Sequence, residues 1–150
     1  MPIGYVNLAD NPIQGGTDPS TGEPFYVCRA YVNGDIVVGK ALLSIRTCWL
    51  PFHNGEHRET TNVEVLTNPN SANFKWVSNV NGLPPQAIKG GRTADREDLY
   101  IGRCTLTING RTMTIPGKIH WTASRNMYVS YELREYQCEN YDVLVCLPGL

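Results

Sequence analysis

One motif occurs twice in this chain and constrains its fold more than any other feature. Each copy is an apolar stretch with a tyrosine and, three residues later, an arginine, and each is followed further along by Gly-Lys. The first copy occupies residues 25–41 and the second occupies residues 99–119. A motif that recurs in this way indicates an internal duplication, in which every copy forms the same structural unit.

The spacing between the two copies is regular. Four pairs of matching positions have offsets of 75, 74, 78 and 78 residues: Gly16 and Gly91, Tyr26 and Tyr100, Lys40 and Lys118, and residues 63–66 and 141–144. The offset changes only in loops, as a true duplication would show. We therefore expect two β repeats, residues 1–70 and 71–150, that are related by a pseudo-two-fold axis and share one core.

The local pattern predicts an all-β fold. No window sustains an apolar period of 3.6 residues, and glycine and proline interrupt the chain often, which argues against helices. Asn33-Gly34 and Asn109-Gly110 predict tight hairpins. Residues 1–24 and 90–98 are expected to be loops. Nine strands are expected, at residues 25–32, 36–44, 45–52, 61–66, 74–80, 99–108, 112–121, 126–133 and 141–146.

The composition excludes several classes of partner. With 13 basic and 14 acidic residues the net charge is -1, so the chain lacks the basic surface that nucleic acid requires. No apolar run is long enough to span a membrane. The N-terminal residues carry neither the basic region nor the apolar region of a secretory signal. These features predict a cytoplasmic protein with no nucleic-acid partner and no membrane span.

The cysteines give a less specific prediction. There are five, and none of them forms a C-x-x-C pair, so zinc ligation is not expected. Two lie inside apolar strands, which favours buried, reduced thiols in a cytosolic protein. A disulfide such as Cys138–Cys146 is the alternative that the sequence leaves open.

No pattern of residues indicates catalysis. The chain contains no G-x-S-x-G, no phosphate-binding loop and no H-E-x-x-H. His53 and His57 flank a turn and resemble a metal pair, but no third ligand lies nearby, so solvated loop histidines are the preferred interpretation. We therefore predict a protein that is not an enzyme and that needs neither a cofactor nor a metal.

The two arginines of the repeated motif are interpreted as structural. Arg29 and Arg103 lie in the middle of expected strands, where a guanidinium needs a carboxylate or buried carbonyls as partners. Glu64 and Asp142, in the closing strands, are the candidate carboxylates.

The repeated lysines offer a candidate binding site. Lys40 and Lys118 each follow a glycine at what is expected to be a turn, and the loop before each strand carries carboxylates, including Asp18 and Asp95. A carboxylate and an ammonium on rigid strand ends suit a neutral polyol, because charge-assisted hydrogen bonds are about twice as strong as neutral ones. The alternative is that the lysines are surface charges and the aspartates form turns. The three tryptophans are expected in the core, although one could stack on a sugar face.

An ordered set of motifs covers nearly the whole chain. It consists of residues 82–91, 99–103, 116–118 and 141–144 in the second half, and Gly15-Gly16, Gly22, 26–30, Gly39-Lys40 and 63–66 in the first. This set resembles the DM-nine repeat family. The resemblance implies tandem antiparallel β repeats, often dimeric, in non-enzymatic lectins that bind mannose in pathogen recognition. A similar module opens natterin-like pore-forming proteins, but pore formation is not expected here, because the sequence contains no aerolysin-like segment.

The resemblance also assigns the sugar-binding residues. In the family, mannose is held by an aspartate of the loop and the lysine of Gly-Lys, which implies Asp18 with Lys40 in the first repeat and Asp95 with Lys118 in the second. The second loop departs from the pattern, since the position that matches Asp18 is a threonine.

The predicted function is therefore a metal-independent lectin for mannose or mannose-type glycans, including those of microbial surfaces. We expect a role in innate immunity, a homodimer, and release by a non-classical route if the protein leaves the cell. The alternative is an intracellular scaffold whose exposed strands pair with other proteins.

Overall fold

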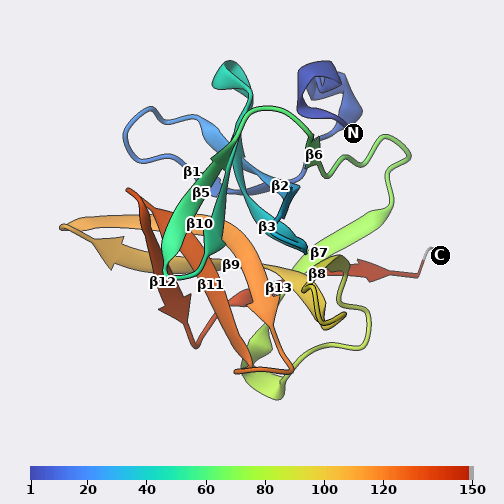
Figure 1. Ribbon diagram of the computed structural model, residues 1–150. Helices are drawn as coiled ribbons and strands as arrows, with labels where there is room; N and C mark the ends of the chain where they lie inside the picture. Colours follow the sequence, from blue (N-terminus) through green and yellow to red (C-terminus); the bar gives the residue numbers. More distant parts are fainter. Residues whose placement is uncertain (149–150) are drawn as a thin grey trace.

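Antiparallel strands run through the whole described part of this chain. The computed structural model describes residues 1–148 (Figure 1), and among them there is no α-helix, only four short 3-10 helices. This confirms the all-β fold class. The last two residues of the expected second repeat lie outside the described residues. The 3-10 helices are η1 (Ile3–Tyr5), η2 (Leu8–Asp10), η3 (Leu43–Ile45) and η4 (Asn79–Asn81).

All the described strands belong to one antiparallel sheet. Its order is β1-β2-β3-β4-β5-β12-β11-β10-β9-β13-β7, while β6 pairs with β2, and β8 pairs with both β3 and β9. The strands are β1 (Gln14–Thr17), β2 (Pro24–Val32), β3 (Asp35–Leu42), β4 (Thr47–Phe52), β5 (Gly55–Glu59), β6 (Val63–Val65), β7 (Asn73–Ser78), β8 (Lys89–Arg92), β9 (Asp98–Ile108), β10 (Arg111–His120), β11 (Asn126–Tyr131), β12 (Arg134–Cys138) and β13 (Asp142–Leu147).

The two halves of the sheet repeat the same backbone hydrogen bonds. In the first half the Val27 amide donates to the Ile13 carbonyl, and the Ile13 amide donates to the Leu66 carbonyl, each at 2.9 Å. In the second half the corresponding bonds run from Ile101 to Ile88, at 3.3 Å, and from Ile88 to Leu144, at 3.0 Å. The matched residues are 74, 75 and 78 positions apart, which are the offsets found in the sequence. The boundary placed between residues 70 and 71 stays a prediction.

The halves join at two places and share apolar packing. Gly55 of β5 pairs with Arg134 of β12, and Ile36 of β3 pairs with Arg92 of β8. Phe25, from the first half, is buried in a cluster made mostly of second-half side chains. Each such aliphatic or aromatic side chain contributes about 1.5–3 kcal/mol through removal from water. The shared core that the sequence predicts is therefore present.

The two Gly-Lys pairs lie inside strands, as the strands expected at residues 36–44 and 112–121 imply, and not at the turns expected for the lysine site. Gly39 and Lys40 belong to β3, and the second pair belongs to β10. A Cβ on Gly39 would stand 2.0 Å from the carbonyl oxygen of Trp49, and one on Gly117 would stand 2.2 Å from that of Tyr128. Glycine is required there because a neighbouring strand crosses too closely for any side chain.

Four strands were not expected from the sequence. They are β1, β5, β8 and β12, and their sequences are rich in glycine or charged residues instead of alternating apolar ones. Backbone pairing with a neighbouring strand, rather than a buried side-chain face, forms them. The strand expected at residues 45–52 begins only at Thr47, because Arg46 takes a left-handed conformation with φ 48°.

The cysteine prediction is wrong for four of the five residues. Disulfides join Cys28 to Cys48 and Cys104 to Cys138, and Cys146 is a free, exposed thiol. The paired Cα atoms are 6.2 and 6.6 Å apart, within the range that a disulfide spans. The partners are brought together by sheet topology, which cysteine spacing alone does not reveal. Separately, none of the helices within residues 1–148 has the length and apolarity needed to cross a membrane.

Candidate functional site

The most unusual side chain in the structure is a buried lysine. Lys40 lies on β3 and is only 4% exposed, although it is charged. Its Nζ lies 4.7 Å from the ring centroid of Tyr131, 5.1 Å from that of Phe25 and 6.0 Å from that of Trp49. Aromatic faces attract a cation at these distances, so the ammonium lies in an aromatic cage.

Two further groups fix the position of this ammonium. Lys40 Nζ donates to the Ser130 carbonyl oxygen at 2.5 Å and pairs with Glu56 Oε2 at 3.3 Å. Glu56 Oε1 accepts a hydrogen bond from the Leu133 amide at 3.1 Å. Lys40 and Glu56 belong to the first half, while Ser130 and Leu133 belong to the second. The site is therefore assembled by both halves.

Burial and the neighbouring carboxylates shift the pKa of Lys40 in opposite directions. Burial lowers the pKa of Lys40, because the charged form loses its water, and the Glu56 carboxylate counteracts this by stabilising the ammonium. Asp18 and Glu132 act in the same direction as Glu56. Lys40 is thus surrounded by three carboxylates that favour its protonated form.

Asp18 lies beside Lys40, as the family resemblance implies. It is 6% exposed and lines the same cavity of about 270 Å³, together with Ser20, Trp49 and Tyr131. It also organises its own loop between β1 and β2. Asp18 Oδ1 accepts from the Ser20 amide at 3.0 Å and from the Ser20 hydroxyl at 2.8 Å, and Oδ2 accepts from the Thr21 hydroxyl at 3.1 Å. The carboxylate is held rigidly at the rim of the lysine pocket.

A related but different arrangement surrounds Lys118. Its Nζ lies 3.7 Å from Glu135 Oε2, with the rings of Phe52 and Tyr128 at 5.7 and 5.8 Å. Burial lowers the pKa of Lys118, and the carboxylates of Glu135 and Asp35 counteract the effect. Phe52 comes from the first half, so this site too is completed across the halves.

Comparison of the two lysine sites shows where they diverge. Asp18 and Thr93 occupy the same place, since the amide of each donates to a glutamate carbonyl, at 2.8 and 2.9 Å. When the two halves are aligned, Leu99 corresponds to Phe25 and His120 corresponds to Leu42. The second site therefore lacks both the rim carboxylate and one wall of the aromatic cage.

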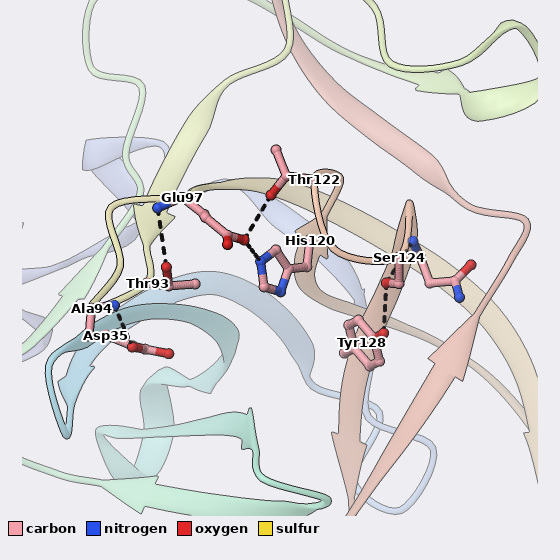
Figure 2. Close-up of polar contacts among 9 residues, drawn as sticks. Asp35, Thr93, Ala94, Glu97, His120, Thr122, Ser124 and Tyr128 are labelled. Carbon is pink, nitrogen blue, oxygen red and sulfur yellow. Dashed lines mark hydrogen bonds and ion pairs between the residues drawn. The ribbon is translucent and has the colours of Figure 1, made fainter.

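Asp95, the carboxylate predicted for the second site, is exposed and pairs with no lysine among the described residues. Asp35, on the hairpin of the first half, instead holds this loop by accepting from the Ala94 amide at 2.7 Å (Figure 2). Figure 2 also shows Glu97 Oε2 between His120 Nε2, at 2.5 Å, and the Thr122 hydroxyl, at 2.8 Å. These hydrogen bonds lower the pKa of Glu97. The loop is thus locked by polar contacts beside Lys118.

The other candidate residues have structural roles or remain outside the lysine sites. Arg29 pairs with Glu64 at 3.1 Å and Arg103 pairs with Asp142 at 3.0 Å, which confirms the predicted partners. His57 contacts Glu59 at 2.8 Å. Within residues 1–148 no group of three or more histidine, cysteine, aspartate or glutamate side chains is arranged to hold a metal ion.

Three residues of the first site were missed by the sequence analysis: Glu56, Ser130 and Tyr131. Glu56 has a signal in the sequence, because it precedes Glu135 by 79 residues, which is also the offset between Trp49 and Tyr128. Ser130 acts through its backbone carbonyl, so its side-chain type carries no signal.

The fold and the two buried lysines, each held by groups from both halves, define a duplicated antiparallel β protein with polar sites between its halves. The model of the DM9 repeat matches residues 18–121. The chain belongs to the DM9 repeat family.

Among solved structures, the crystal structure of the nematode sperm cell motility protein MFP2B is similar to this chain. Its TM-score is 0.68 at 15% sequence identity, and the match covers 94% of this chain and 43% of that one. This chain therefore corresponds to less than half of that protein, and at this identity the likeness concerns the fold alone. No match was found among curated proteins.

Proposed function

We propose that this protein is a non-enzymatic, metal-independent lectin and that it binds mannose or mannose-type glycans in the Lys40 pocket. The observation that carries the proposal is that Lys40 and Asp18 line one small, partly aromatic cavity. Sugar hydroxyls both donate and accept hydrogen bonds, so a pocket must offer partners of both kinds to replace lost water.

The hydrogen-bonding capacity of the pocket is not exhausted by the protein. An ammonium has three donors; on Lys40 one goes to the Ser130 carbonyl, and a second faces the Glu56 carboxylate, the ion-pair partner at 3.3 Å. A carboxylate has about four acceptor sites, and Asp18 accepts three hydrogen bonds from its own loop. One donor and one acceptor therefore remain for a pair of neighbouring sugar hydroxyls. Trp49 and Tyr131 offer apolar faces for the sugar ring.

The surroundings of Lys118 are proposed as a second, weaker site. The resemblance assigns Asp95 to it, whereas Asp35 and Thr93 lie on the hairpin and loop near Lys118. The missing rim carboxylate and the smaller aromatic cage support lower affinity or a different sugar preference. Charge-neutral variants of Asp95 and Asp35 distinguish which carboxylate serves this site.

The biological setting is proposed from family membership. Binding of microbial glycans in innate immunity and assembly into a homodimer fit a DM9 lectin. A cytoplasmic location with non-classical release is retained from the sequence, but the two disulfides favour exposure to an oxidising compartment.

The test is calorimetric titration of the protein with mannose in the presence of a chelator. We expect tight binding to be lost in Asp18→Asn, because the rim acceptor loses its charge. Lys118→Met should remove only the weaker site, and Lys75→Met is its matched control, since Lys75 lies on β7, outside both pockets. Full mannose binding by Asp18→Asn would refute the assignment of the first site, and absence of binding to mannose and to a broad glycan array would refute the function.

The alternative function is an interaction scaffold. It is supported by β7, which lies at one end of the sheet order and bears the exposed Val77. Capture of protein partners that competing mannose does not release would favour it.

A further inference from the structure

A polar groove lies beside the Lys40 pocket, and we infer that it is a second subsite for the same glycan, filled only by chains longer than one sugar. This inference rests on the proposed lectin function and extends it from a monosaccharide to an oligosaccharide. The groove has a volume of about 670 Å³, against about 270 Å³ for the lysine pocket. A hollow of about 430 Å³ continues it and shares Arg103, Thr105 and Asp142 with it.

The pocket and the groove lie on the two sides of one short loop. Asp18 and Ser20 line the lysine pocket, while Thr17 and Pro19, which alternate with them, line the groove. A Cβ on Gly16 would stand 1.8 Å from the Thr114 carbonyl oxygen, so the chain before the loop lies directly against β10. A glycan with one sugar beside Asp18 therefore has to cross only this loop to reach the groove.

The loop between the two sites is held in place. The Asp18 amide donates to the Glu23 carbonyl at 2.8 Å, and the Gly22 amide donates to the Asp18 carbonyl at the same distance. The Gln14 side-chain amide donates to the Gly16 carbonyl at 3.0 Å. A loop ordered in the free protein loses little entropy when a ligand binds across it.

The groove presents hydroxyl groups in pairs. Thr105 and Thr114 both line the groove and face each other across β9 and β10, and Thr112 of the lining faces Thr107 beside it, with 2.8 Å between the hydroxyl oxygens in each pair. A pair of hydroxyls uses one hydrogen atom for its own bond, which leaves the second hydrogen and several lone pairs for a ligand. This side of the sheet can therefore both donate and accept, as a sugar chain requires.

The charges in the groove cancel. Arg103 Nε lies 3.0 Å from Asp142 Oδ2, and the guanidinium also stacks on Trp76 with 4.8 Å between its Cζ and the ring centroid. A phosphate-bearing ligand would need an uncompensated positive charge. An open, neutral groove with a hydroxyl array fits a neutral polyhydroxylated chain.

The experiment compares mannose, mannobiose, mannotriose and mannopentaose by calorimetry with the full chain. We expect the trisaccharide to bind at least tenfold more tightly than mannose. The double variant Thr105→Val/Thr114→Val keeps the shape of one pair and removes its hydroxyls, so it should abolish the gain from chain length and leave the affinity for mannose unchanged. Thr60→Val is the matched control, because Thr60 is exposed and lines neither site.

The outcomes separate the subsite from the lectin function. Equal affinity for mannose and all the longer chains overturns the subsite alone, and so does an unchanged chain-length gain in the double variant. An equal loss of affinity for every saccharide in that variant also overturns the subsite, because the groove would then not be distinct from the pocket. Absence of binding by every saccharide overturns both proposals. Thermal unfolding of each variant verifies that the fold is retained.

Discussion

Replacement of Lys40 by methionine should destabilise the fold far more than loss of a surface charge. The side chains of Lys40 and Glu56 are only 5% and 6% exposed, so their ion pair belongs to the buried class. Lys40→Met leaves the Glu56 carboxylate without its cation and the Ser130 carbonyl without its donor. Removing one partner of a buried pair costs about 3–5 kcal/mol, whereas an exposed pair contributes about 0–1 kcal/mol.

The double variant Lys40→Met/Glu56→Gln supplies the decisive comparison. Glutamine is uncharged and can still accept from the Leu133 amide through its side-chain oxygen. The second change should therefore restore most of the lost stability, so that the two substitutions are strongly non-additive.

The assay is urea unfolding followed by tryptophan fluorescence, with the free energy of unfolding taken from the midpoint and slope. Trp49 lies beside the substituted position and reports directly on this region. A loss below about 1 kcal/mol in Lys40→Met would place the pair in the exposed class. Additive losses in the double variant would show that Glu56 is not stabilised by the ammonium. Either result would refute the burial argument.

Two further predictions follow from the disulfides and from Glu97. Intact mass spectrometry of the unreduced protein should show a mass four hydrogen atoms below that of the fully reduced chain, with one thiol, Cys146, open to alkylation; five alkylated thiols without reductant would contradict the observed pairing. The lowered pKa of Glu97 contributes stability that is present above its ordinary value of 4.5 and is lost as the pH falls through the lower folded-state pKa. Glu97→Gln should therefore flatten the acid limb of the stability curve below pH 4.5, and an unchanged slope in pH-dependent unfolding would exclude this role for the His120 contact.

The sequence predicted the parts of this fold that depend on buried side chains. The long strands β2, β3, β9 and β10 carry apolar patterns and strong hairpin turns, and they formed where expected. The strands that were missed, such as β8 and β12, are held by backbone pairing and carry no such pattern. Register between distant strands also decides the disulfide partners, which is why residue spacing gave the wrong redox state.

The candidate site was predictable only in part for a similar reason. Lys40 belongs to a repeated sequence motif, the family resemblance singles out Asp18 among the loop carboxylates, and the structure brings the two to one cavity. The residues around Lys40 could not be predicted from the sequence, because Ser130 contributes only its backbone carbonyl and Tyr131 lies in the other half of the chain. The strand pattern around Lys40 also does not show that its side chain points into the protein, where it is buried instead of exposed.

Each lysine site is built from residues of both halves, and this bears on how a duplicated protein of this kind can diversify. Lys40 depends on Ser130 and Tyr131, and Lys118 in turn contacts Phe52, so neither half alone contains a complete lysine site. Two separate copies of one such half would complete each other's sites reciprocally, as partners in a symmetric dimer do. Because both halves belong to one chain here, the two lysine sites do not have to be identical. One site can therefore keep a ligand while the other acquires a different preference.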